Sequence, residues 1–459
     1  MQLFSIHLAP PDFLRPISTL LLICTIVCAK PLAAHADAPH PDPKPRVIVT
    51  TDGETDDRCS MNRFLLYTND WNVLGLIHSS SKHHWKGDDT HPEKKWEPVS
   101  WLDRQLDAYE AIHPSLSAHD KDYPTADYLR AQVFVGNIAY EGDMELETPG
   151  SNRIAEVLLD GDDSPVWLQA WGGPNTIARA LKSIETRHPE RMAEVSKKAR
   201  IYLISEQDVT YKTYIRDAWP DIQVLRSGSE SYGVLAYRWQ NYQTTEMQTY
   251  FDKDWMTTNM LNDHGPLGAL YETKDKRFRS EGDSPAFLHV INTGLRSEED
   301  PRYGGWGGQF AFSNGMWRSV DGENTTPHSI LRWAIDFQND WAARADWCVK
   351  QPAEANHHPQ LRLASPLDIT AKAGETIALD ASLSKDPDGD VLSFRWWFYE
   401  ESSTYGNAVA IEDPEHAKAS VTLPMDGKTG DTFHFVCTAT DGGTPTLRRH
   451  ARLIVTIVE

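Results

Sequence analysis

The sequence predicts an α/β domain with a doubly wound, mainly parallel sheet, followed by a small all-β immunoglobulin-like sandwich. Apolar runs such as RVIVTT and RIYLIS lack the alternation of half-exposed strands, which is typical of strands buried on both faces. Helical stretches separate these runs, and strands that alternate with helices indicate a parallel sheet. Near residue 350 the pattern changes to short alternating runs with turn sequences such as DPDGD between them, which predict a sandwich.

The individual elements follow from these patterns in chain order. Strands of the parallel sheet are expected at 46–51, 71–80, 165–171, 200–205 and 222–227. Helical spacing of apolar residues with good helix formers predicts helices within 61–70, 151–161 and 175–199. The strands of the sandwich are expected within 375–382, 391–399, 419–425, 432–441 and 451–458.

The first residues predict export of the chain. A lone Arg15 precedes a short apolar stretch, and AHA at 34–36 supplies small residues around a cleavage site. We therefore predict a signal peptide over 1–36, cut near Ala36, and a secreted or periplasmic protein. An uncleaved anchor is the alternative, although the apolar run is short for a membrane span. After it we predict a proline-rich tether, the α/β domain, a linker and the sandwich over 37–45, 46–345, 346–365 and 366–459.

The charge of the chain limits its partners. Lysine and arginine number 45 against 66 aspartates and glutamates, which gives a formal net charge of −21. A nucleic-acid polymer is therefore not expected as a partner, because its binding needs a basic surface. No second long apolar segment predicts a membrane span, and a homo-oligomer stays open. Beyond the signal, Cys59, Cys348 and Cys437 allow one disulfide at most.

An acidic stretch follows the first predicted strand. In VIVTTDGETDD, Asp52, Glu54, Asp56 and Asp57 fall within six positions. Ligands of doubly wound sheets bind beyond the carboxyl ends of the strands, which is where this loop lies. Crowded carboxylates need a positive partner, and Ca²⁺ prefers six to eight oxygen ligands. The alternative is that Asp56 and Asp57 only cap the helix that begins near Arg58, but one cap needs one acid.

Three motifs resemble sequences of a known family. VIVTTDGETDD resembles the signature of the calcium-dependent nucleoside hydrolases, and WGGPNTIARAL (171–181) and DHGPLGAL (263–270) are similar to two later motifs of those enzymes. With the segment 281–310, they most resemble a secreted bacterial branch of nucleoside-hydrolase-like proteins that are described as cellulose-binding and carry a C-terminal β-sandwich. The resemblance spans almost all of the chain after the predicted signal.

The resemblance implies a calcium site. Its ligands would be Asp52, Asp57 and the backbone carbonyl of Asn175. Where the family has a further aspartate ligand in the late motif, this chain has Gly265. Asp263, two residues earlier, is the candidate replacement, and without it the metal would be weaker, replaced or absent.

The resemblance also implies roles in catalysis. Asp52 would be the base that takes a proton from water, Asp56 would hold ring hydroxyls, and His264 would be the acid, unless it is a packed histidine. His83 and His84 follow the second predicted strand, and we predict that only one of them, His83, faces the substrate. Further pocket candidates are Glu206, Asp208, Glu281, Asp283 and, as a ring that stacks on a sugar, Trp306.

Two functions are consistent with these features. The preferred one is an exported, metal-assisted hydrolase that cleaves a glycosidic, N- or O-ribosyl-like bond in a sugar conjugate. The alternative is a non-catalytic protein that binds a carbohydrate such as a cellulose-like glucan on a hydrolase scaffold. A binding module has no evident need for Asp52, Asp56 and Asp57 together, which favours the enzyme.

Overall fold

The computed structural model describes residues 44–322 and 328–459. The predicted signal peptide, its cleavage near Ala36 and nearly all of the tether lie outside the described residues. In the part of the chain that the structure does describe, no helix combines the length and the apolar character that crossing a bilayer requires.

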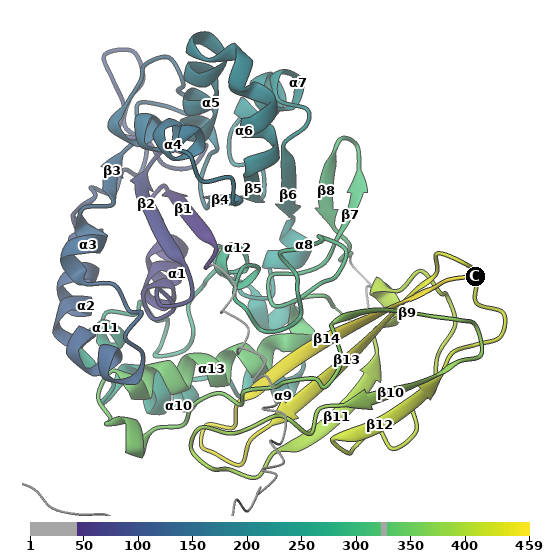
Figure 1. The fold of residues 1–459 in the computed structure, drawn as a ribbon. Coiled ribbons are helices and arrows are strands. Elements are labelled where there is room, and N and C mark those ends of the chain that lie inside the picture. Colours follow the sequence, from purple (N-terminus) through teal and green to yellow (C-terminus); the bar gives the residue numbers. More distant parts are fainter. Residues whose placement is uncertain (1–43, 323–327) are drawn as a thin grey trace, which may run out of the picture. The chain divides into compact units, whose positions relative to one another are not determined.

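An eight-stranded sheet forms the centre of the first part of the chain (Figure 1). In spatial order its strands are β3 (Val133–Val135), β2 (Asn72–His78), β1 (Arg46–Thr51), β4 (Val166–Ala170), β5 (Ala199–Ile204), β6 (Gln223–Ser227), β8 (Met316–Ser319) and β7 (Phe310–Ser313). All neighbours pair in parallel except β7 and β8. The predicted mainly parallel sheet is therefore confirmed. The sequence reading missed only the three short strands at the two ends of the sheet.

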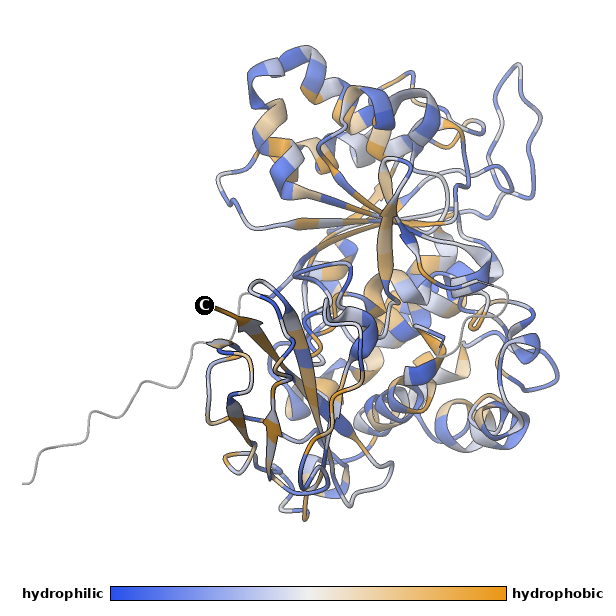
Figure 2. Ribbon diagram, turned by 90° about the vertical axis from the view of Figure 1, so that its right-hand side faces the viewer, coloured by the Kyte–Doolittle hydropathy of each residue, from blue (hydrophilic) through white to orange (hydrophobic). Residues whose placement is uncertain are grey.

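Helices cover both faces of this sheet. Val47 and Val49 of β1 belong to a core that includes Phe64, whereas Ile48 between them belongs to a second core with Leu181. Because successive side chains of a strand point to opposite faces, apolar residues at every position require a cover on each side. Figure 2 shows this as apolar colouring along the central strands.

The helices divide between the two cores. On the Ile48 side lie α4 (Pro149–Leu159), α5 (Asn175–Arg187) and α6 (Met192–Lys198). On the Val47 side lie α1 (Thr55–Leu65), α2 (Ser100–His119), α12 (Ser284–Leu288) and α13 (Ala334–Trp347). The other α-helices are α3 (Ala126–Arg130), α7 (Arg216–Ala218), α8 (Ser229–Tyr232), α9 (Thr245–Gln248), α10 (Lys253–Met256) and α11 (Gly265–Ala269). Short 3₁₀ or π segments are η1 (Pro189–Arg191), η2 (Tyr211–Ile215), η3 (Trp239–Asn241), η4 (Thr257–Leu261), η5 (Leu331–Trp333), η6 (Pro352–Glu354) and η7 (Glu400–Ser402).

The C-terminal part consists of two further sheets. One contains, in spatial order, β11 (Ser393–Phe398), β13 (Thr432–Thr440), β14 (Arg448–Ile457) and β9 (Asp368–Ala371), and the other pairs β10 (Thr376–Asp380) with β12 (Lys418–Thr422). The pairs are antiparallel except β14 with β9, which is parallel. Trp396 and Phe435 lie in the core between the sheets. The predicted C-terminal antiparallel sheets are confirmed, and the immunoglobulin-like detail stays a prediction.

Strand β14 joins this part to the α/β domain. The guanidinium of Arg452, which is fully buried, donates to the carbonyls of Leu295 and Tyr303, each at 2.7 Å. On the same strand Arg449 lies 3.1 Å from Asp340 of α13. These charge-assisted hydrogen bonds fix the strand against the helical layer.

A second buried charge pair lies inside the α/β domain. The guanidinium of Arg63 in α1 donates to Glu281 at 2.6 Å, and both side chains are fully buried. Arg63 also donates to the carbonyl of Phe337 in α13 at 3.1 Å. The pair therefore connects α1 with α13 and with the segment that leads into α12.

Removing one member of this pair should destabilise the protein strongly. Glu281→Ala leaves the Arg63 charge buried without its partner, so we expect the free energy of unfolding to fall by roughly 3–5 kcal/mol. Urea denaturation followed by circular dichroism measures the change. The matched control is Glu272→Ala, because Glu272 pairs with Arg58 near the surface and should cost less than about 1 kcal/mol. Equal effects of the two substitutions would contradict the assignment.

Candidate functional site

The acidic loop lies at the point where the sheet changes direction. From β1 the chain continues to β2 and β3 on one side, and it later returns to β4 on the other side of β1. A crevice forms beyond the strand ends at such a switch point, and ligands of doubly wound sheets bind there. Asp52 follows β1 directly, and Asp56 and Asp57 lie in the first turn of α1.

Short contacts hold the first aspartates in place. The backbone N–H of Asp52 donates to Oδ1 of Asp57 at 3.2 Å, and the hydroxyl of Thr51 donates to the same oxygen. The turn after β4 approaches closely, since a Cβ atom added at Gly172 would lie 3.0 Å from Cβ of Asp52. Asp52 and Asp57 are both buried, so their carboxylates are shielded from water.

Asp283 completes a group of three carboxylates. Ligand atoms of Asp56, Asp57 and Asp283 lie within 4.8 Å of one another, and a second such group contains Asp52, Glu54 and His84. Oδ2 of Asp52 and Oδ2 of Asp283 are buried without a hydrogen-bond partner. Burying a carboxylate oxygen that accepts no hydrogen bond costs free energy unless a cation is coordinated by it. Clustered carboxylates of this kind fit a hard divalent cation.

The electrostatics of the cluster follow from burial and crowding. Burial, and then repulsion from Glu54 and Asp52, raises the pKa of Asp56 to about 7. Burial and the neighbouring carboxylates also raise the pKa values of Asp57 and Asp283 well above the usual range. For Asp52 burial acts in the same direction, but the neighbouring His84, Ser81 and Asp57 outweigh it and lower its pKa. Without a cation, the cluster keeps protons that isolated aspartates would have lost.

Two residues of the late motif do not reach this site, which corrects the sequence-based expectation. Asp263 is exposed, and His264 contacts the carbonyl of Asn262 and, at 3.2 Å, Asp346 of α13. The neighbouring Gly265 packs against Ile112 of α2. The N-terminal end of α2 lies near the acidic loop, because a Cβ atom added at Gly53 would contact Trp101. Ile112, which contacts Gly265, therefore lies roughly 16 Å along α2 from Trp101. The additional carboxylate of the cluster belongs to Asp283 instead.

Asn175, the first residue of α5 after the glycine-rich turn, makes several buried hydrogen bonds. Its backbone N–H donates to Asp208 at 3.0 Å, and its side-chain amide donates to the carbonyls of Asn137 and Asp143. Asp208 also accepts from Thr210, so this buried carboxylate anchors a loop and is not free for a substrate. Asn175 thus organises the loops around the turn, while a role of its carbonyl as a metal ligand stays a prediction.

Three other candidates have structural roles. Glu281 is committed to Arg63, as described above, and Glu206 pairs with Lys212 and with Arg226 at 3.2 Å. Trp306 is only 1% exposed and packs against Phe337, so its ring is not available to stack on a sugar. The glycines that flank it let the chain pass close to buried neighbours, as Gly307 does at Pro285 and His289.

Of the two adjacent histidines, His84 faces the acidic residues. Its Nδ1 lies 3.7 Å from Oδ2 of Asp52 and 3.7 Å from Oε2 of Glu54, whereas His83 is exposed at the rim. Burial acts to lower the pKa of His84, but Asp52 and Glu54 outweigh it, so its pKa lies above the usual value. His84 is therefore the histidine that lies against the acidic residues, whereas the role of His83 as a substrate contact stays a prediction.

Sequence reasoning missed Tyr237. Its hydroxyl lies 3.2 Å from Glu54 and 3.2 Å from Asp56. It stands in a loop after α8 that carries no motif, so no pattern in the sequence points to it. With Glu54, Asp56, both histidines and other residues it lines a cavity of about 200 Å³ beside the carboxylates.

The fold and this site define a protein with a nucleoside-hydrolase-like domain and a C-terminal β domain. Residues 46–310 match a family described as cellulose-binding Sde182, nucleoside hydrolase-like domain. Residues 376–457 match the description cellulose-binding protein Sde0182, C-terminal domain. The chain belongs to this family.

Among solved structures, a nucleoside hydrolase-related hypothetical protein from Saccharophagus degradans, associated with carbohydrate metabolism, is 30% identical over 90% of this chain and 100% of that chain, with a TM-score of 0.77. The PKD domain from the KIAA 1837 protein and mouse cadherin-23 EC22-24 each match 22% of this chain, at 22% and 18% identity over 91% and 31% of their own lengths. Their TM-scores of 0.17 are too low for an inference. No curated protein matches this chain.

Calcium should stabilise the protein through Asp57 and Asp283. At a free concentration one hundred times the Kd, one bound ion adds about 2.7 kcal/mol to the free energy of unfolding. We expect Asp57→Asn and Asp283→Asn to weaken calcium binding at least tenfold, measured by isothermal titration calorimetry. Asp263→Asn is the matched control and should bind as the unsubstituted chain does. A loss of affinity in the control alone would restore Asp263 as the ligand.

The metal-free protein should lose stability as the pH rises. The pKa of Asp56 is raised from 3.8 to about 7, so the folded state holds a proton that the unfolded chain releases above about pH 4. This contribution is present at low pH and is lost as the pH rises through about 7. Thermal unfolding in chelator between pH 5 and 8 measures it, and Asp56→Asn should flatten the slope. A midpoint that rises over this range would contradict the prediction.

Proposed function

We propose that the chain is an exported, calcium-assisted hydrolase of a glycosidic, N- or O-ribosyl-like bond in a sugar conjugate. The observation that supports this most directly is the pair of buried carboxylate oxygens without partners, on Asp52 and Asp283, in the crevice at the switch point of the sheet. Burying a carboxylate oxygen without a hydrogen-bond donor costs free energy, which a bound cation would offset. Perturbed carboxylates beside a cavity are typical of catalytic sites.

The residues of the site suit distinct tasks. A bound divalent cation supplies Lewis-acid chemistry at sugar hydroxyls and water. Asp56, Asp57 and Asp283, whose ligand atoms lie together, would hold it, with Asp52 as a further predicted ligand. Asp52 is the group to accept a proton from water, because its lowered pKa keeps it ionised. His84, 3.7 Å away, is a positioning residue that maintains this charge. Asp56 and the hydroxyl of Tyr237 border the cavity, where they can bind ring hydroxyls.

The second candidate function is carbohydrate binding without catalysis. It is favoured by the description of the matching family as cellulose-binding and by the displacement of His264, the predicted acid, from the site. In this function the acidic cluster would serve stability, and the ligand would be a glucan surface.

Asp52→Asn separates the two functions. We expect it to lower kcat on a panel of p-nitrophenyl glycosides, ribosides included, at least 100-fold, because general-base catalysis typically contributes that much. The fold should persist, as shown by an unchanged circular dichroism spectrum, and Asp263→Asn should retain full turnover. Full activity of Asp52→Asn would overturn the hydrolase proposal. No turnover by the unsubstituted chain, together with binding to insoluble cellulose that survives Asp52→Asn, would favour the second function.

A further inference from the structure

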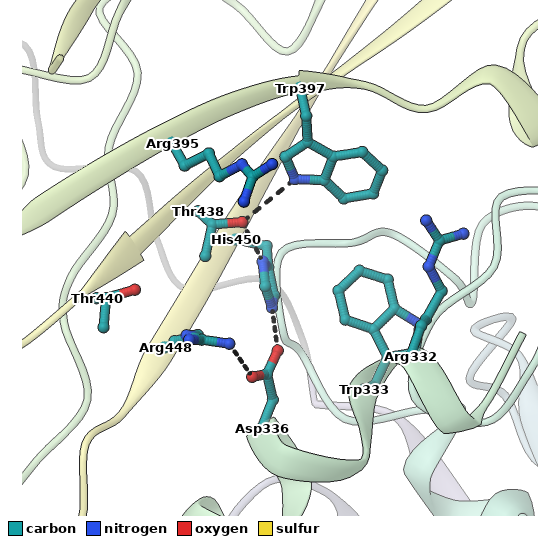
Figure 3. Close-up of a pocket in the computed structure, with 9 residues that line it drawn as sticks. All are labelled: Arg332, Trp333, Asp336, Arg395, Trp397, Thr438, Thr440, Arg448 and His450. Atoms are coloured by element: carbon teal, nitrogen blue, oxygen red, sulfur yellow. Dashed lines mark hydrogen bonds and ion pairs between the residues drawn. The ribbon is translucent and has the colours of Figure 1, made fainter. Parts of the chain in front are cut away.

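A second cavity, of about 450 Å³, lies between α13 with the residues before it and the sheet that contains β14 (Figure 3). Its volume falls in the range of small-molecule sites, roughly 300–1,000 Å³. It is lined by Arg332, Trp333, Asp336, Arg395, Trp397, Thr438, Thr440, Arg448 and His450. None of these residues belongs to the acidic site at the end of β1.

Strand register brings the polar residues of this cavity together. Arg395 of β11 pairs with Thr438 of β13, which pairs with His450 of β14, and Thr440 pairs with Arg448. Residues directly opposite each other in neighbouring strands point to the same face. The apolar residues between them, such as Trp396, point to the core of the sandwich. The face of this sheet that is turned to the α/β domain is therefore polar at the cavity. A sheet face that packs tightly on a second layer would be apolar instead.

Two tryptophan side chains, Trp333 and Trp397, lie beside these polar residues. The rings of Trp333 and Trp397 are 6.2 Å apart and tilted by 45°. Trp397 is half-buried, and its Nε1 donates to Thr438 at 3.3 Å, which fixes the ring. The guanidinium of Arg332 lies 5.3 Å from the centre of the Trp397 ring. Trp333 is only 4% exposed, so the half-buried ring of Trp397 is the part of this surface that a ligand can contact.

The charges of the lining favour an anion. Three arginines stand against a single carboxylate, Asp336, which accepts from Arg448 at 2.9 Å and lies 3.4 Å from His450. Outside the cavity, Glu401 pairs with Arg332 at 3.1 Å. The side chain of Arg395 is 71% exposed, and the carboxylate of Glu415 lies 3.9 Å from it. Arg395 and Arg448 therefore keep guanidinium donors free, since each has five.

We propose that this cavity is a second carbohydrate site and that it takes an acidic sugar, one that carries a carboxylate. The guanidinium fork matches a carboxylate in two parallel hydrogen bonds, and the half-buried ring of Trp397 would contact the sugar. The site is independent of the proposed hydrolase activity, because the two share no residue. Its walls are preformed, since Arg452 and Arg449 fix β14 to the helical layer.

Isothermal titration of the whole chain with trigalacturonate, and with cellotriose as a neutral probe of the same length, tests the proposal. We expect trigalacturonate to bind at least tenfold more tightly than cellotriose, and more weakly at high salt. Arg395→Gln should weaken trigalacturonate binding at least tenfold without lowering the melting temperature, because this side chain is largely exposed. Arg362→Gln removes an equal charge from an exposed residue outside the cavity and should change nothing.

Three results would overturn the proposal. Equal affinity for the two probes, or no binding of trigalacturonate, would show that the cavity does not select a carboxylate. Unchanged affinity of Arg395→Gln would place the ligand elsewhere. Loss of trigalacturonate binding in Asp57→Asn would assign the ligand to the acidic site, whereas retained binding in that variant supports a separate one.

Discussion

The buried ion pair between Arg63 and Glu281 connects the parts of the molecule on which the site depends. Arg63 lies on the same helix as Asp56 and Asp57, and Glu281 precedes Asp283 by two positions, so the pair holds the facing carboxylates in register. Glu281 also accepts from Tyr271 at 3.0 Å and Ser284 at 2.8 Å, which satisfies a charge that burial would otherwise make costly. Through Phe337 and Gln338, Arg63 reaches α13 as well. The helix that borders the second cavity is thus fixed by the same guanidinium.

Much of this arrangement follows from local sequence patterns. The central strands and their helical covers could be predicted because a strand buried on both faces is apolar at every position. The cluster at Asp52, Asp56 and Asp57 could be predicted because three carboxylates within six residues are costly to bury as charges without a counter-charge. Each of these two predictions rests on a short stretch of sequence and on a stated physical reason.

The remaining site residues depend on contacts that spacing does not encode. The late motif makes Asp263 the candidate ligand and leaves Asp283 a pocket candidate, and only the packing of α11 against the far part of α2 excludes the first. His83 and His84 are adjacent in the sequence, but the side chain of His83 is exposed to solvent and that of His84 lies beside Asp52. Trp306 shows that flanking glycines permit close packing as readily as mobility. Tyr237 reaches the carboxylates from a loop without any motif.

The separation of the ligands along the chain has a consequence for how the molecule is held together. The three cysteines among the described residues are all free and buried, so no disulfide cross-links this part of the chain. Arg63 and Glu281, which flank the facing carboxylates, are 218 residues apart. A cation shared by Asp57 and Asp283 would close a loop of similar length, and such a closure restricts the unfolded chain as a covalent cross-link does. Unlike a disulfide, this cross-link would be made and broken by the calcium concentration around the protein rather than by its redox state.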